Sequence, residues 1–298
     1  MNLRERLQRP AADFEMRYRH CTPGEAGFSL LEVLVATAIT VGVGAATFQL
    51  FHQNERIFRD QSLKLEMQQG ARLIASQIAD DIRMTGQGIP ALLGDTILPG
   101  SGTSRLNLRT GFSATESVVS SPAPLLVADG TPTSVIVEST TGFSSGRQAF
   151  LWTENDWARV TVTSVSGASR SIRFTPTVTS RTPLLFALPP ALSLDEAVSI
   201  YRDAATNTVR RTTATNTENL AQPAWAPANE LAANVSELTF LYFDVEGRQV
   251  NPDTALNRTQ VALIEARVSV GSSAPLSDGS RPTYALSVRA IPRNMRLR

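Results

Sequence analysis

One stretch of the chain, residues 28–51, is almost entirely apolar. It reads FSLLEVLVATAITVGVGAATFQLF, and Glu32 is the only charged residue in its 24 positions. As an α-helix, which rises about 1.5 Å per residue, this stretch is about 36 Å long and can cross the hydrocarbon core of a bilayer. The sequence therefore predicts a membrane-spanning helix over residues 28–51. The residues before it and those after it then lie on opposite sides of the membrane.

The 27 residues before the apolar stretch are polar and contain five arginines. They outnumber the basic residues that soon follow the stretch, which are Arg56, Arg59 and Lys64. Because positive charge beside a spanning helix tends to stay in the cytoplasm, the N-terminus is predicted to be cytoplasmic. We interpret residues 1–27 as a leader. A start at Met16 in place of the first methionine leaves a leader of 12 residues, and the sequence leaves both starts open.

A periodic pattern continues the helix beyond the apolar stretch. Six residues recur every three or four positions and form one apolar stripe: Leu63, Met67, Gly70, Ile74, Ile78 and Ile82. Gly86 and Gly88, followed by Pro90, are typical of a helix end. We therefore expect one long helix that ends near Thr85, with residues 52–88 forming an amphipathic half that packs on a domain.

Residues 89–298 differ in composition, because Ser, Thr, Gly and Pro become frequent and short β-prone runs appear. The three clearest runs come late and predict an antiparallel sheet: Val235–Val245, Val261–Val270 and Tyr284–Ile291. Two stretches, 112–133 and 203–232, are predicted to be long irregular loops. The expected fold class is α+β, with a long N-terminal α-helix packed on an antiparallel β-sheet head.

The residue types that most enzyme chemistry needs are scarce. Cys21 is the only cysteine, and the two histidines are His20 and His52. A head with neither residue type offers no Ser-His-Asp triad, no thiol nucleophile and no zinc ligated by Cys or His. We therefore expect no enzymatic activity, no cofactor and no metal. The net charge of +1 gives no indication of nucleic-acid binding.

The most informative residues open the apolar stretch and read Gly27-Phe28-Ser29-Leu30-Leu31-Glu32. An acidic side chain in lipid costs about 2.5–3.5 kcal/mol on insertion scales, so Glu32 requires a partner or a function. If the chain is cut after Gly27, a new α-amine appears at Phe28, one helical turn from Glu32. In a helical filament, Glu32 of one subunit can then neutralise the amine of a neighbour.

This segment resembles the class III signal of type IV pilins and type II secretion pseudopilins. The family pattern is Gly, then Phe or Met, three apolar or small residues, and Glu, which Gly27, Phe28 and Glu32 match here. The resemblance implies the type IV pilin fold. It also implies cleavage between Gly27 and Phe28 by a prepilin peptidase that N-methylates the new terminus, and a role for Glu32 in assembly.

Two further segments resemble PilW-type minor pilins. One is RLIASQIADDIRMTG at residues 72–86, and the other is VSELTFLYFD at residues 235–244, together with the closing Pro292-Arg293-Asn294. The resemblance implies a structural minor pilin that helps prime or cap a type IV pilus. Its implied partners are other minor pilins, the major pilin and an inner-membrane platform protein. It implies a single-pass inner-membrane protein whose head lies in the periplasm or on the cell surface. Residues 91–230 match no family pattern.

Other interpretations of the chain stay open. GspJ-type pseudopilins of type II secretion systems share much of this layout. From a different class, Trp152, Trp157 and Trp225 allow a membrane-anchored adhesive or carbohydrate-binding protein, although core or loop positions are the simpler interpretation for these rings. A secretory signal peptide cut near Ala45 is disfavoured by Glu32 and by the length of the apolar stretch.

Several carboxylates allow more than one interpretation. Asp244, Glu246 and Asp253 lie close together in the sequence and allow calcium binding, but their spacing is not that of an EF-hand, so a turn is favoured. The adjacent Asp80 and Asp81 fall beside the apolar stripe of the helix. They are predicted to face solvent.

Overall fold

The computed structural model describes residues 28–87, 89, 96–111, 115–122 and 124–292. Gly27, at the predicted cleavage site, and the rest of residues 1–27 lie outside these ranges. The chain divides into two units, Met1–Glu55 and Arg56–Arg298, and the first long helix runs from one into the other.

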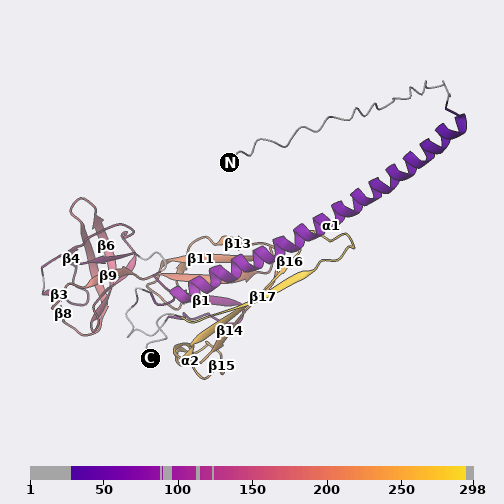
Figure 1. Ribbon diagram of the computed structural model, residues 1–298. Coiled ribbons are helices and arrows are strands. Elements are labelled where there is room, and N and C mark those ends of the chain that lie inside the picture. The colour runs from indigo at the N-terminus through magenta and orange to yellow at the C-terminus, as the bar shows by residue number, and fades with distance from the viewer. Residues whose placement is uncertain (1–27, 88, 90–95, 112–114, 123, 293–298) are drawn as a thin grey trace, which may run out of the picture. The chain divides into compact units, whose positions relative to one another are not determined.

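Helix α1 spans Leu30–Met84 and is the long coil of Figure 1. The prediction of a single long helix is therefore confirmed, with each end within two residues of its expected position. The apolar part of α1 contains an 18-residue stretch that is hydrophobic enough to cross a membrane. None of this stretch is buried in the protein. No other helix in the described ranges has these properties. By length and composition, α1 is consistent with a membrane anchor.

The apolar stripe of α1 is buried in the second unit. Met67, Ile74, Ile78 and Ile82 are buried there, in contact with the strands described below. The helix ends as predicted, because Gly86 follows it with a φ of 83°, a left-handed conformation that glycine adopts without strain.

The predicted late antiparallel sheet is confirmed. Its strands pair in the order β15-β14-β16-β17. Their bounds are Gln249–Val250, Val235–Phe243, Leu263–Gly271 and Thr283–Ala290, and a short helix, α2 (Ala255–Gln260), precedes β16. Along β14, Leu238, Phe240 and Tyr242 join the α1 stripe in one core. The alternate residues of β14, such as Leu241 and Phe243, are half-buried, so the second face of this strand is only partly covered.

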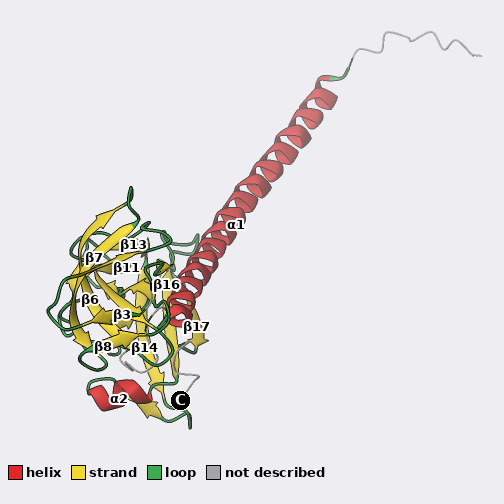
Figure 2. Cartoon of the chain, turned by 90° about the vertical axis from the view of Figure 1, so that its left-hand side faces the viewer, coloured by secondary structure: helices red, strands yellow, loops and turns green. Residues whose placement is uncertain are grey.

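A second sheet contributes to the same core. It pairs β1 (Arg105–Arg109), β10 (Ala197–Asp203), β11 (Thr208–Asn216) and β12 (Ala224–Trp225) in that order, and β13 (Asn229–Ala232) pairs with β11. Strands thus make up most of the regular secondary structure of the second unit (Figure 2). The loop prediction for residues 203–232 is wrong, since β11 to β13 lie within it. Strand β11 reads TVRRTTATN, and its branched threonines suit a half-buried pleated surface.

Residues 115–194, which we call the inserted lobe, lie between β1 and β10 in sequence although those two strands are hydrogen-bonded neighbours. The lobe holds a six-stranded sheet in the order β2-β9-β5-β6-β7-β4 and a ribbon of β3 and β8. In chain order, β2 to β9 span Glu116–Val118, Leu125–Val127, Thr133–Ile136, Gln148–Trp152, Trp157–Ser166, Ser171–Thr179, Leu184–Phe186 and Ala191–Leu194. The lobe has a hydrophobic core of its own. Because β2 and β3 lie within residues 112–133, that loop prediction is also wrong.

The prediction for the aspartate pair at the end of α1 is wrong for one of its members. Asp80 is exposed and pairs with Arg83 at 2.8 Å, as a residue on a solvated face does. Asp81, by contrast, is buried and accepts two hydrogen bonds from the Arg211 guanidinium, at 2.8 and 3.0 Å. This bidentate pair joins the end of α1 to β11. Its partner is 130 positions away along the chain, so local sequence gives no sign of it.

A second buried carboxylate, Glu265, lies on the face of the late sheet that points away from the core. Glu265 sits between Ile264 and Ala266, which face the core, so its side chain points to the opposite face. Its two oxygens accept hydrogen bonds from Arg267 and Arg289, each at 2.7 Å. The hydrogen bond from Arg267, aided by that from Arg289, outweighs the effect of burial and holds the pKa of Glu265 below its ordinary value.

This lowered pKa predicts a pH dependence of stability. A carboxyl group that is more acidic in the folded state stabilises the fold at pH values above its unfolded pKa, and the contribution is lost as pH falls through the folded pKa. Between about pH 5 and pH 2, the wild-type protein should therefore lose more stability than Glu265→Gln, which has no charge to lose. Thermal melting of both proteins at pH 7 and at low pH measures this. Equal losses in the two proteins would contradict the role assigned to Glu265.

Candidate functional site

Two key residues of the predicted signal, Phe28 and Glu32, lie at the start of α1. Phe28 precedes the helix and is 79% exposed. The Val33 N–H donates to the Ser29 carbonyl at 3.2 Å, so regular helical bonding starts here and Glu32 lies in the first turn. The Glu32 side chain is exposed and has no hydrogen-bond or ion-pair partner among the residues that the structure describes. The first turn thus presents an unpaired acid beside an exposed apolar residue.

The surface of α1 that follows Glu32 is compatible with lipid. Its side chains are exposed and mostly apolar. The threonine hydroxyls among them are satisfied within the helix, because those of Thr37, Thr40 and Thr47 donate to the carbonyls four residues earlier, at 2.7 to 2.8 Å. A spanning helix needs this internal satisfaction, since lipid tails offer no hydrogen bonds.

A second apolar stripe, which sequence analysis missed, lies on α1 within the second unit. Phe58, Leu65 and Leu73 are 72%, 56% and 64% exposed. They recur at spacings of seven and eight, the repeat of a helix–helix seam. At about 100° per residue, their mean direction lies about 160° from that of the buried stripe. We call these three residues the outer stripe. A search at spacings of three and four does not find it, because Gln61, Ser62 and Gln69 lie at the intermediate positions.

A buried ion cluster lies where the inserted lobe joins the rest of the second unit. Asp195, between β9 and β10, accepts two hydrogen bonds from Arg109 on β1, both at 2.7 Å, and one from Arg159 on β6 at 3.1 Å. Arg159 also donates to the carbonyls of Thr217 and Glu218. All the polar contacts of the cluster are internal, so its evident role is structural.

Of the carboxylates considered for calcium, Asp244 and Glu246 form a turn, while Asp253 accepts a hydrogen bond from Asn251 Nδ2 at 2.6 Å. Asp244 accepts hydrogen bonds from the backbone N–H groups of Glu246 and Arg248 and from Arg248 Nε, while Glu246 pairs with Arg248. Burial alone raises the pKa of Asp244, but these bonds from Arg248 outweigh it and the pKa falls. Within the described ranges, no group of three or more His, Cys, Asp or Glu residues is placed to hold a metal ion.

The three tryptophans occupy different environments. Trp225 packs on a small cluster formed by Leu98, Ala197 and Ala214, and Trp157 meets Phe150 edge to face at 6.5 Å between ring centroids. For these two rings, the interpretation as packing residues is supported. Trp152 instead lines a pocket in the inserted lobe.

No family model, curated protein or solved structure matches the chain. What stands is an α+β protein with one long apolar N-terminal helix and antiparallel sheets. The type IV pilin fold and the processing signal remain predictions that rest on the sequence around Gly27, Phe28 and Glu32.

Proposed function

We propose that the chain is a minor pilin, cut after Gly27 by a prepilin peptidase and assembled through α1 into a type IV pilus. The observation that carries the proposal is Glu32, an acid in the first turn of an apolar helix with no partner in the described chain. An isolated acid at that position is costly in lipid, which favours a partner supplied by another molecule.

Cleavage after Gly27 supplies such a partner. Each mature subunit then carries one amine at Phe28 and one carboxylate at Glu32, about one helical turn apart. If each acid pairs with the amine of the next subunit, every subunit both gives and receives the same contact. A contact of this head-to-tail kind propagates as an open helical filament when the rotation between subunits does not close into a ring.

The outer stripe supports assembly through the helix. The buried stripe of α1 is covered by the two sheets of its own chain, while Phe58, Leu65 and Leu73 remain exposed on nearly the opposite side. Exposed apolar residues at heptad-like spacing favour a helix of a neighbouring subunit as their cover. In the proposal, these neighbours are the major pilin and other minor pilins, all held at the inner membrane by a platform protein.

A minor pseudopilin of a type II secretion system uses the same features. The effect of deleting the gene separates the two functions. Deletion of the gene abolishes or reduces surface pili if the chain is a minor pilin. Loss of exported enzymes with normal piliation assigns it to secretion instead. Both functions are structural, and neither gives the chain catalytic chemistry.

Processing provides the first test of the proposal. In cells that contain a prepilin peptidase, the mature protein should begin with N-methyl-Phe28, as measured by intact mass and N-terminal sequencing. Gly27→Leu should block cleavage, because a side chain at this position crowds a protease subsite that accepts only hydrogen. Gly24→Leu is the matched control, since it makes the same change three residues earlier and should leave cleavage unaffected. A mature protein that starts elsewhere, or an uncut wild-type chain, would falsify the assignment.

A further inference from the structure

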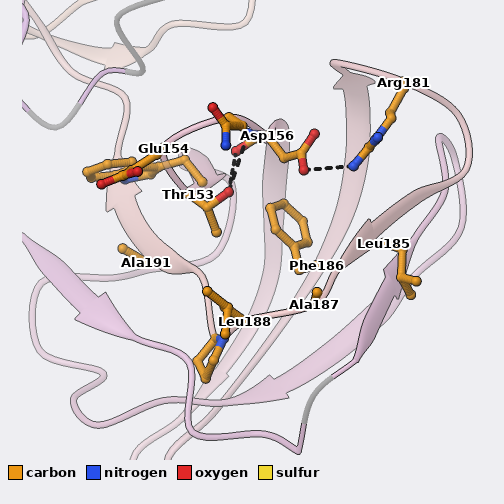
Figure 3. Close-up of a pocket in the computed structure, with 12 residues that line it drawn as sticks. Thr153, Glu154, Asp156, Arg181, Leu185, Phe186, Ala187, Leu188 and Ala191 are labelled. Atoms are coloured by element: carbon orange, nitrogen blue, oxygen red, sulfur yellow. Dashed lines mark hydrogen bonds and ion pairs between the residues drawn. The ribbon is translucent and has the colours of Figure 1, made fainter.

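A pocket of about 600 Å³ opens in the inserted lobe, remote in sequence from α1. One side is the turn between β5 and β6, which carries Thr153, Glu154 and Asp156, and the other is the segment after β8, which carries Leu188 (Figure 3). The volume lies within the range of ligand pockets, about 300–1,000 Å³. It is large enough for one or two sugar rings.

The walls of the pocket differ in chemistry. Trp152, Leu185 and Leu188 provide apolar surface, and Leu188 is 72% exposed. The indole N–H of Trp152 donates to Ser193 Oγ at 3.0 Å, which fixes the orientation of the ring. An aromatic ring held in this way offers a preformed flat apolar surface to a ligand.

The residues on the polar side of the pocket are held in place by hydrogen bonds to one another. The Thr153 N–H donates to the Asp156 carbonyl at 2.8 Å, and the Asp156 N–H donates back to Thr153 Oγ1 at 3.3 Å. Arg181 pairs with Asp156 Oδ2 at 2.8 Å. The side chains of Glu154 and Asn155, at the tip of this turn, make no hydrogen bond to other residues of the described chain. Their polar groups are therefore available on a turn that is already ordered, which reduces the entropic cost of binding.

We propose that this pocket binds a terminal sugar residue of a glycan. A pyranose ring has an apolar C–H face, which suits the Trp152 ring, and an edge of hydroxyls that both donate and accept hydrogen bonds. Glu154 and Asp156 accept, Arg181 donates, and Asn155 does both. The only cation of the lining is already paired and two carboxylates stand beside it, so a neutral or amino sugar fits better than an acidic one. This inference goes beyond the proposed assembly role and does not depend on it, since it concerns different residues.

The test uses the full chain, purified in a zwitterionic detergent because a detergent with a sugar head group competes for the pocket. The probe is an array of immobilised neutral, amino and acidic mono- and disaccharides, where dense display amplifies weak binding. Wild type should be retained on some neutral or amino sugars. The affinity for the free sugar is then measured by calorimetric titration. Trp152→Ala should bind about tenfold more weakly than wild type, the order expected for the loss of one stacked ring, and Trp152→Phe should lose less affinity than Trp152→Ala. Glu154→Ala should weaken binding about fivefold, as expected for one lost hydrogen bond.

Trp225→Ala and Glu138→Ala are the matched controls, because they remove a half-exposed tryptophan and an exposed glutamate that do not line the pocket. Both should bind like wild type. Glu154 lies at an exposed turn, so its substitution tests the site even if Trp152→Ala fails to fold. No retention of wild type on any sugar, retention on acidic sugars only, or unchanged affinity in Glu154→Ala would overturn the proposal. Normal processing and piliation in Glu154→Ala would show that the assembly role stands separately.

Discussion

Asp195→Ala is expected to lower the free energy of unfolding of the second unit by about 3–5 kcal/mol, the cost of removing one partner from a buried ion pair. The Asp195 side chain is completely buried, and that of Arg109 is 2% exposed. Alanine leaves Arg109 without its counter-charge in the interior and removes the carboxylate that pairs with Arg159. Burial already lowers the pKa of the Arg159 guanidinium, and Asp195 is the first group that opposes this shift. The variant removes that compensation and opens a small void as well.

Urea unfolding followed by tryptophan fluorescence measures this effect directly, because all three tryptophans belong to the second unit. Asp195→Asn keeps the shape of the side chain and part of its hydrogen bonding, so it should lose less stability than Asp195→Ala. The matched control is Asp80→Ala, which breaks an Asp–Arg pair of similar length, 2.8 Å, on the exposed surface. An exposed pair is worth about 0–1 kcal/mol. Similar small losses for both alanine variants would show that the buried cluster does not stabilise the fold.

The same cluster also joins the strands of two hydrophobic cores. Arg109 lies on β1, whose Leu106 and Leu108 belong to the core that α1 covers. Arg159 lies on β6, whose Ala158 and Val160 belong to the core of the inserted lobe. Without Asp195, the lobe should unfold more independently of the rest. A single cooperative transition in wild type and two transitions in Asp195→Ala are therefore the expected pattern.

The sequence predicts the parts of this fold that depend on local periodicity. The buried stripe of α1 recurs every three or four residues and ends at Gly86, so both the helix and its packed face follow from spacing alone. The late sheet follows from three long β-prone runs in succession, and β14, β16 and β17 pair in the order in which they occur.

The parts that sequence analysis misses depend on contacts between distant residues. Strands β1 and β10 are neighbours, yet the whole inserted lobe separates them in the chain. Arg211 and Asp195 look like ordinary charged residues until the fold places their partners beside them. Local sequence predicts a loop at β11 because its threonines and arginines are polar, although the strand pairs with β10 in a largely buried ladder. Of the candidate assembly site, Phe28 and Glu32 are readable from sequence, whereas the outer stripe needs the buried face to be known first.

Glu32→Leu is expected to abolish the recruitment of partner pilins while leaving the protein in the membrane. Leucine inserts into lipid at least as well as glutamate, so the amount of membrane-bound protein should not fall. Cleavage after Gly27 should also continue, because the cut lies five residues before the substitution. In the proposed filament, however, the Phe28 amine of the neighbouring subunit would be left buried and unpaired. Breaking a buried pair in this way costs about 3–5 kcal/mol, which is a factor of at least about 100 in affinity at each contact.

Co-purification of partner pilins, together with counts of surface pili, measures the loss. Glu32→Gln keeps the size of the side chain and can still accept a hydrogen bond from the amine, so recruitment should fall less than in Glu32→Leu. Glu55→Leu makes the same change on the same helix at a residue outside the apolar stretch, where the side chain is 80% exposed, and it should assemble normally. Because the leucine variant is processed and inserted, a defect in recruitment can only arise after insertion. Undiminished recruitment and piliation by Glu32→Leu would remove the pairing mechanism, since no other described group offers the amine a counter-charge within the first turn of α1.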